Sequence, residues 1–129
     1  MIHLDSNFLI RASVAGTDES RLLRRWLSDG EHLGTSAVAW AEFLCGPVSD
    51  EAASSAATLV GEPEPLDASA ATAAARLFNE TGRRRGSLSD CMIAASAVQA
   101  GAQLATADVA DFRRFEPLGL SLVGRKAKN

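Results

Sequence analysis

The sequence lacks the features that mark several large classes of protein. None of its apolar runs approaches the roughly 18 residues that a membrane-spanning helix needs, so we expect no contact with a membrane. The first residues do not combine a basic segment with an uninterrupted apolar stretch, and we therefore expect no secretory signal. The glycine patterns of P-loop and dinucleotide-binding enzymes are missing too, which disfavours both kinds of enzyme.

Cysteine is scarce, with two residues in a chain of 129. Cys45 and Cys91 stand in apolar contexts that are typical of helices, and they do not have a metal-ligand spacing such as C-x-x-C. We interpret both as buried free thiols of a protein that stays in the reducing cytoplasm.

Basic charge is limited and comes almost entirely from arginine. The net charge of −3 argues against a protein that binds nucleic acid through a broad basic surface. Arginine nevertheless supplies 11 of the 13 basic residues, and three of them are consecutive at 83–85. Because a guanidinium group suits phosphate better than an ammonium group does, local binding of phosphate is compatible with this composition.

What the sequence does contain is an alternation of strand and helix patterns. Short strands are expected over 1–5, near 32–35, over 102–106 and over 118–123. Helices are expected over 7–14, 19–29, 37–45, 49–60, 68–81 and 88–100, with a short helical turn over 108–115. This order predicts an α/β protein of three layers with a central, mainly parallel β-sheet. We expect one domain over 1–124 and a basic, flexible tail over 125–129.

Polar residues and prolines mark the ends of these elements. Ser6 and Asn7 are expected to start the first helix. The segment 61–67 contains two prolines and is expected to be an extended connection or an edge strand. Further helix caps are expected at Thr17 or Asp18, at Ser36, at Ser49, and at Asp67 or Ser69.

Several acids stand far from other charged residues. Asp5 is the only acid in residues 1–17, and Glu42 is the only charged residue between positions 31 and 50. Asp90 is the only charged residue between positions 85 and 108, where Asp108 follows a predicted strand. Because lone acids inside apolar segments are costly to bury, we expect each to have a compensating partner.

A structural role is open to most of these acids. Asp5 could cap a helix, Asp90 could form a capping box with Ser87, and Asp108 could complement a helix dipole. Glu42 has no such role, because it lies well inside its helix with no basic residue three or four positions away.

Carboxylates that are brought together repel one another, and a hard divalent cation such as Mg²⁺ or Mn²⁺ removes that cost. Since ligands of parallel sheets bind beyond the carboxyl ends of the strands, acids at strand ends are candidates for such a site. A cation held there would favour metal-assisted hydrolysis of a phosphodiester. His3 and His32 are expected to be structural, because neither has a second histidine at a ligand spacing.

Four sequence blocks, in this order and spacing, resemble the PIN-domain family, and specifically VapC-type toxins of type II toxin–antitoxin (VapBC) systems. The blocks are "LDSN" at 4–7, "AEFLCG" at 41–46, "SDCMIAASA" at 89–97 and "LATADVADFRRF" at 104–115. The resemblance extends over essentially the whole chain, although 49–60 and 61–67 carry no motif. Ser89 departs from the pattern, because relatives often have proline before the third acid.

The resemblance implies a three-layer α/β/α PIN-like fold and a metal-dependent endoribonuclease that uses Mg²⁺ or Mn²⁺. Asp5 and Asp90 would be the central catalytic and metal-binding residues, and Glu42 and Asp108 would complete the site directly or through water. Asp108 is preferred to Asp111 because it follows the "LAT" strand directly. Asn7 and Thr106 would be small polar residues that position ligands or water. Ser6 would either do the same or cap the first helix.

Partners follow from the same resemblance. RNA would be the substrate, and we expect at least one of Arg83, Arg84 and Arg85 to contact its phosphates, with Arg113 and Arg114 as second candidates. A cognate VapB-type antitoxin would block the acidic pocket, often with a basic side chain. A homodimer would form through apolar helical faces, for which the candidates are Leu9, Leu22, Leu23 and Trp26. Core or interface packing is favoured over base stacking for Trp26, Trp40 and Phe43.

Two alternatives differ in class. A phosphoacceptor receiver domain has a similar size and pattern, but it needs a lysine near the end of its fifth strand, and the only lysines here are Lys126 and Lys128. That alternative is disfavoured. A non-catalytic PIN fold that binds RNA or a protein partner stays open.

Overall fold

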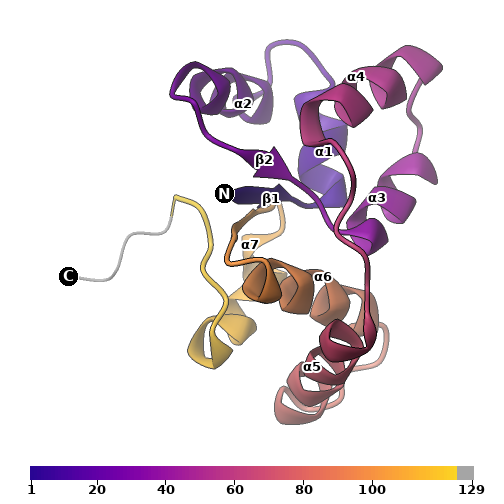
Figure 1. Cartoon of the computed structure of the whole chain (residues 1–129), viewed down its shortest axis with the longest axis vertical. Coiled ribbons are helices and arrows are strands. Elements are labelled where there is room, and N and C mark those ends of the chain that lie inside the picture. The colour runs from indigo at the N-terminus through magenta and orange to yellow at the C-terminus, as the bar shows by residue number, and fades with distance from the viewer. Residues whose placement is uncertain (125–129) are drawn as a thin grey trace.

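A computed structural model describes residues 1–124 of the chain, and the predicted flexible tail over 125–129 lies outside the described residues. Three short strands form a parallel sheet in the order β2-β1-β3 (Figure 1). His3 in the central strand lies opposite Gly34 on one side and Leu104 on the other. The strands are β1 (Ile2–Leu4), β2 (Leu33–Gly34) and β3 (Gln103–Ala105).

Seven α-helices and one 3-10 helix surround the sheet within the described residues. Six predicted helices are present with ends that differ by at most two residues, and the predicted helical turn over 108–115 corresponds to α7 and the first part of η1. The sequence periodicity therefore identified the helices correctly. They are α1 (Ser6–Ala12), α2 (Asp18–Ser28), α3 (Ala37–Leu44), α4 (Asp50–Val60), α5 (Ala68–Glu80), α6 (Leu88–Gln99), α7 (Val109–Phe112) and the 3-10 helix η1 (Arg113–Leu118).

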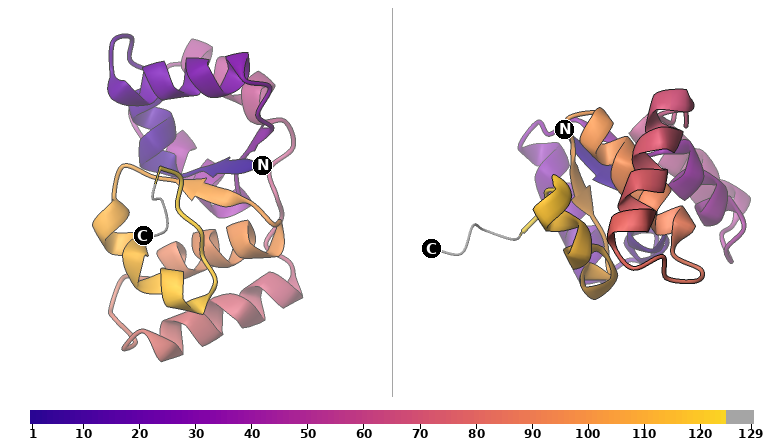
Figure 2. Two further views of the ribbon diagram at one scale, coloured as in Figure 1. Left: turned by 90° about the vertical axis from the view of Figure 1, so that its left-hand side faces the viewer. Right: turned by 90° about the horizontal axis from the view of Figure 1, so that it is seen from below.

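The sheet lies between two layers of helices. In Figures 1 and 2, α1, α2 and α4 stand on one side of β1, and α5, α6 and α7 stand on the other. Each side has its own buried apolar cluster: Leu4, Phe8 and Phe43 belong to the first, and Ile93 and Leu104 to the second. This arrangement confirms the predicted three-layer α/β fold.

The predicted last strand, over 118–123, is wrong. Only an isolated bridge joins Leu122 to Leu104, with hydrogen bonds from Leu104 N to Ser121 O (2.8 Å) and from Val123 N to Leu104 O (2.9 Å). The chain instead winds into η1, which contains Pro117 and ends at Gly119 with a φ of +115°. The left-handed conformation at this glycine leaves too few extended residues for a strand.

Segment 61–67 is extended, as its prolines predict. Glu64 forms an isolated bridge with Ser36, just beyond the carboxyl end of β2. Its backbone N donates to Thr35 O (2.8 Å), and its carbonyl accepts from Ala37 N (2.7 Å).

Most of the predicted caps are present, but the first helix has a different cap, and the alternative of a capping box at Asp90 does not hold. Asp5, and not Ser6 or Asn7, is the N-cap of α1, where its carboxylate accepts from Ser6 N at 2.8 Å. The Ser87 hydroxyl donates to Arg84 O and does not cap α6, so there is no capping box with Asp90. The predicted caps that do accept a backbone N–H are Thr17, Ser36, Ser49 and Asp67.

Aromatic residues pack in the core, as expected. The ring of Trp26 stacks on Phe8, and Phe43 is fully buried beside Trp40; both pairs of ring centroids are 5.4 Å apart.

Cys91 is buried as predicted, but Cys45 is exposed, because it follows the last residue of α3 at the surface. Among residues 1–124 we find no helix of the length and apolar character needed to span a bilayer.

Candidate functional site

The carboxyl ends of β1 and β3 open into a pocket of about 470 Å³. Asp5 enters it directly after β1, and Asp108 follows β3 by three residues. Helix α3 supplies Glu42 from its second turn, and α6 supplies Asp90 from its first turn. The structure thus brings all four predicted acids together. The complete lining is Asp5, Ser6, Asn7, Ala41, Glu42, Cys45, Asp90 and Asp108.

A second groove of about 520 Å³ lies between α1, α2 and α4. Small and apolar side chains and serines line it, and Glu51 is the only charged residue among them. It therefore lacks the groups that acid–base or metal chemistry needs, and the acidic pocket is the candidate site.

Asp5 is the most buried of the pocket acids, with 3% of its surface exposed. One carboxylate oxygen accepts from Ser6 N, and the other accepts from the Thr106 hydroxyl; both distances are 2.8 Å. Burial raises the pKa of Asp5 to about 6, with smaller contributions from the charges of Asp90 and Glu42, and the two hydrogen bonds oppose this rise. The two hydrogen bonds therefore do not fully compensate the ionised form of Asp5 for its burial.

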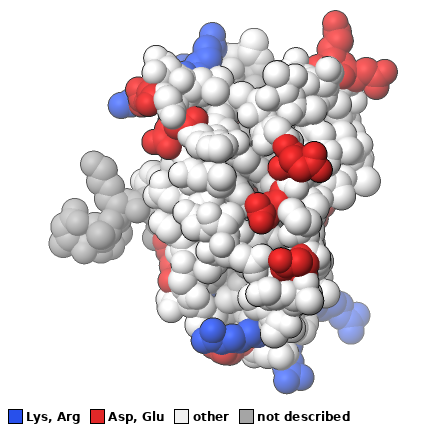
Figure 3. Space-filling model, in the orientation of Figure 1, with Lys and Arg blue, Asp and Glu red and all other residues white. Residues whose placement is uncertain are grey.

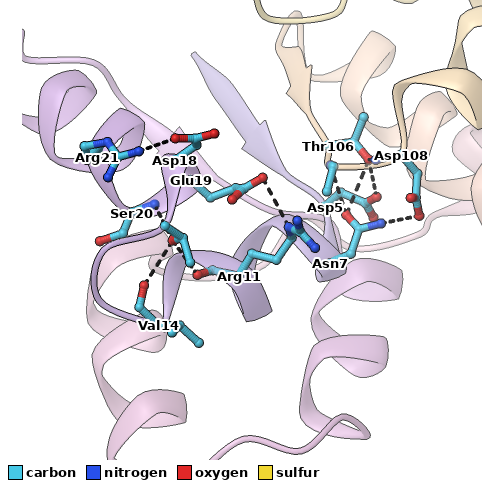
Figure 4. Close-up of polar contacts among 12 residues, drawn as sticks. Asp5, Asn7, Arg11, Val14, Asp18, Glu19, Ser20, Arg21, Thr106 and Asp108 are labelled. Atoms are coloured by element: carbon cyan, nitrogen blue, oxygen red, sulfur yellow. Dashed lines mark hydrogen bonds and ion pairs between the residues drawn. The ribbon is translucent and has the colours of Figure 1, made fainter.

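Thr106 and Asn7 connect the two strand ends. The Thr106 hydroxyl donates to Asp5 and accepts from Asp108 N (3.0 Å), while Asn7 Oδ1 accepts from Ala107 N (3.2 Å). The Asn7 amide in turn donates to the Asp108 carboxylate. Figure 4 shows these side chains pointing toward one another from α1 and from the loop after β3. The contacts hold two carboxylates in place across about a hundred residues of sequence.

Glu42 does not need the buried partner that its sequence context predicts, because it is exposed. Helix α3 turns this residue toward the rim of the pocket, where its carboxylate accepts from the Ser6 hydroxyl at 3.2 Å. Ala39 and Phe43 of the same helix are fully buried in the core, whereas Ala41 and Cys45 line the pocket beside Glu42. A lone acid in an apolar segment can therefore face solvent.

Asp90 is half-buried and has one cationic neighbour. Arg114 Nη2 lies 3.9 Å from its carboxylate. Burial raises the pKa of Asp90, the positive charge of Arg114 lowers it, and the charges of Asp111 and Glu42 raise it. No spacing in the sequence indicates this ion pair, because its two residues lie 24 positions apart.

Comparison with known proteins identifies the family. The PIN domain family matches residues 2–116. The chain belongs to the PIN-domain family. Among curated proteins, none matches the sequence.

Solved structures with this fold include toxin–antitoxin complexes. VapBC2 from Rickettsia felis, bound to a DNA fragment from its promoter, is 20% identical with a TM-score of 0.73, over 95% of this chain and 97% of that one. VapBC-1 from nontypeable Haemophilus influenzae is 20% identical with a TM-score of 0.70, and the match covers 95% of this chain and 96% of that one. VapC20 from Mycobacterium tuberculosis, a toxin that cleaves the sarcin–ricin loop, is 21% identical with a TM-score of 0.59. The match covers 80% of this chain and 85% of that one.

PIN domains generally use divalent metal ions. Within residues 1–124, no three His, Cys, Asp or Glu side chains stand close enough together to hold one ion as they are placed. The donor chemistry of the pocket fits such an ion, because its acids supply only oxygen ligands and the buried Asp5 lacks a full counter-charge. His3 is buried in β1 and His32 is exposed, and neither lines this pocket.

The arginine triplet lies in the turn between α5 and α6. All three side chains are exposed, and none is among the residues that line the acidic pocket in the described part of the chain. On the face of the PIN domain shown in Figure 3, basic side chains stand at the upper left and the lower end and form no continuous basic surface. Contact between Arg83, Arg84 or Arg85 and RNA stays a prediction.

Proposed function

We propose that this PIN domain is a metal-dependent endoribonuclease that acts in the cytoplasm as the VapC-type toxin of a toxin–antitoxin pair. The observation that carries the proposal is the convergence of Asp5, Glu42, Asp90 and Asp108 on one open pocket from four separate elements. The fold similarity to VapBC complexes and to a toxin that cleaves the sarcin–ricin loop supports it.

Asp5 and Asp90 would be the main ligands of Mg²⁺ or Mn²⁺, with Glu42 and Asp108 binding it directly or through water. When bound, the ion would lower the pKa of a water molecule and offset the charge of the scissile phosphate. The Thr106 hydroxyl keeps the Asp5 carboxylate in one orientation, and the Asn7 amide does the same for Asp108. Ser6 donates to Glu42 and restrains it at the rim.

The proposed partners are RNA, a VapB-type antitoxin and a second copy of this chain. Arg83, Arg84 and Arg85 would bind RNA phosphates, and the antitoxin would place a basic side chain in the acidic pocket. Leu9 is buried in the core, so it cannot form part of a dimer interface as predicted. Leu22 is 40% exposed and remains a candidate, together with the partly buried Leu23 and Trp26.

The test is cleavage of total cellular RNA by the purified chain, freed of any antitoxin, with Mg²⁺ or Mn²⁺. We expect cleavage that EDTA abolishes and that the Asp5→Asn, Asp90→Asn double variant lacks. Asp67→Asn, which removes a charge at the start of α5 and outside the pocket, is the matched control and should cleave normally.

Two other results would change the proposal. Cleavage by the double variant would mean that the acids of this pocket are not the active site. Binding of RNA without cleavage, by folded protein with Mn²⁺ bound, would favour the alternative of a non-catalytic PIN module.

A further inference from the structure

We infer that Arg114, which lies against Asp90 beside the acidic pocket and is not among the residues that line it, binds a phosphate oxygen of RNA next to the divalent ion. The inference rests on the proposed function and deepens it. It adds Arg114 to the three arginines of the α5–α6 turn that are proposed to bind RNA phosphates, and it separates Arg114 from its neighbour Arg113 at the start of η1.

Arg114 differs from those other arginines in burial and in the number of its contacts. Its side chain is only 17% exposed, whereas Arg113 and the triplet in the α5–α6 turn are exposed. The guanidinium carbon lies 4.5 Å from the centroid of the Phe115 ring, which is itself fully buried. Nη1 donates to the carbonyl of Asp111. The guanidinium group therefore keeps its position without help from the pocket acids.

The hydrogen-bonding capacity of Arg114 is incompletely used. Nη2 lies 3.9 Å from the Asp90 carboxylate, which is close enough for an ion pair but too long for a hydrogen bond. Nε is buried and has no hydrogen-bond partner among the described residues. Because Nε is buried, a ligand in the pocket cannot reach it, and Nη1 already has a partner, so Nη2 is the donor that stays available.

A phosphate group explains why Nη2 lies beside the pocket without a hydrogen bond to Asp90. A divalent ion bound by Asp90 would take up the negative charge that now faces Arg114. Phe115 and the Asp111 carbonyl hold the guanidinium group, so it cannot follow Asp90 and would be left with a free Nη2 donor. A phosphate oxygen of RNA supplies the missing anion, because the guanidinium group binds phosphate by charge-assisted hydrogen bonds.

The same geometry predicts that Arg114 weakens binding of the ion. Its positive charge lies against one of the proposed ligands and repels a second cation. Arg114→Met should therefore bind Mn²⁺ more tightly than wild type, by roughly three- to tenfold after solvent screening. Arg113→Met, which makes the same charge change at an exposed neighbour, should change Mn²⁺ affinity less than twofold, on the order of the effect of a surface charge.

The first experiment is calorimetric titration of Mn²⁺ into wild type, Arg114→Met, Arg113→Met and Asp90→Asn, each checked for folding by thermal melting. If wild type and Asp90→Asn bind Mn²⁺ alike, the proposed function itself fails. If Asp90→Asn loses binding but Arg114→Met binds no more tightly than wild type, only the inference about Arg114 fails.

The second experiment measures binding of a labelled 12-nucleotide single-stranded RNA of mixed sequence, with Ca²⁺ present to limit cleavage. Arg114→Met should bind about tenfold more weakly than wild type. The slope of log K against log salt concentration should also fall in magnitude by about 0.7, the value for one lost phosphate contact on a single strand. A residue with a purely structural role would not change that slope.

Arg113→Met should leave the slope unchanged, and an equal change in both variants would overturn the inference. If Arg114→Met does not fold, Arg114→Lys decides, with Arg113→Lys as its control. Lysine keeps the charge but loses the planar donor group, so Mn²⁺ affinity should match wild type while RNA binding weakens several-fold, roughly as expected for loss of a forked contact. Unchanged RNA binding by Arg114→Lys would also overturn it.

Discussion

Replacing Asp5 with asparagine should stabilise the metal-free protein, although it removes the central residue of the pocket. The pKa of Asp5 rises from 3.8 to about 6, mainly because the carboxyl is buried. The pKa of Asp5 is higher in the folded protein than in the unfolded chain. The contribution of Asp5 to the free energy of unfolding is therefore most favourable below about pH 3.8, and it is lost as the pH rises through about 6. At about 1.4 kcal/mol per pH unit, the ionised carboxylate destabilises the protein by about 3 kcal/mol above pH 7.

Asparagine removes that charge at little steric cost. Its side-chain oxygen can accept from Ser6 N as the carboxylate does, and its amide can donate to the Thr106 hydroxyl after that hydroxyl turns. The rotation of the hydroxyl breaks the hydrogen bond that Thr106 now donates, and this loss offsets about 1 kcal/mol of the stabilisation gained by removing the charge. We therefore expect Asp5→Asn to raise the free energy of unfolding by about 1–2 kcal/mol at pH 8, and by much less near pH 4.

The measurement is urea unfolding in EDTA at several pH values, with Asp67→Asn as the matched control. Asp67 also caps a helix, but its side chain is exposed. The hydrogen bonds that its carboxylate accepts, above all the one from Ala70 N, lower its pKa. Its ionised form therefore favours the folded state above its unfolded pKa, and Asp67→Asn should destabilise the protein at pH 8 or leave it unchanged. If Asp5→Asn destabilises as well, or if its effect does not vary with pH, the account of a charge-strained pocket is wrong.

Three further results are expected. Mn²⁺ should raise the melting temperature of wild type by several degrees, as binding to the folded state alone predicts, but not that of the Asp5→Asn, Asp90→Asn variant. Thr106→Val should lower stability by about 1–3 kcal/mol and slow RNA cleavage, because Asp5 loses a buried donor, and Thr106→Ser should restore both, as measured by urea unfolding and cleavage assays. Ellman's reagent should label Cys45 but not Cys91 in the native protein and both in urea, because only Cys45 is exposed and burial raises the pKa of the Cys91 thiol. Rapid labelling of both thiols without denaturant would contradict the buried position of Cys91 in α6.

Local sequence was sufficient for the helices, the class of fold and the choice of candidate acids. Apolar periodicity and capping residues such as Thr17 and Ser36 act within a few positions, so they can be recognised without knowing what packs where. The isolation of Asp5 and Asp90 among neutral residues is also visible in the sequence alone. Parallel strands then bring the residues that follow β1 and β3 to one edge, which is why Asp5 and Asp108 share a pocket.

Tertiary structure decided how exposed each side chain is and which partners it meets. The hydrogen bond from Thr106 to Asp5 joins residues 101 positions apart, and the ion pair of Arg114 with Asp90 depends on how η1 packs against α6. Glu42 faces solvent only because the apolar side of its helix is used by the core. Burial and long-range contact depend on the packing of the layers, whereas composition and periodicity describe single segments. For this reason the sequence by itself could name the acids of the pocket, but only the folded chain showed which one is buried and which one has a cation beside it.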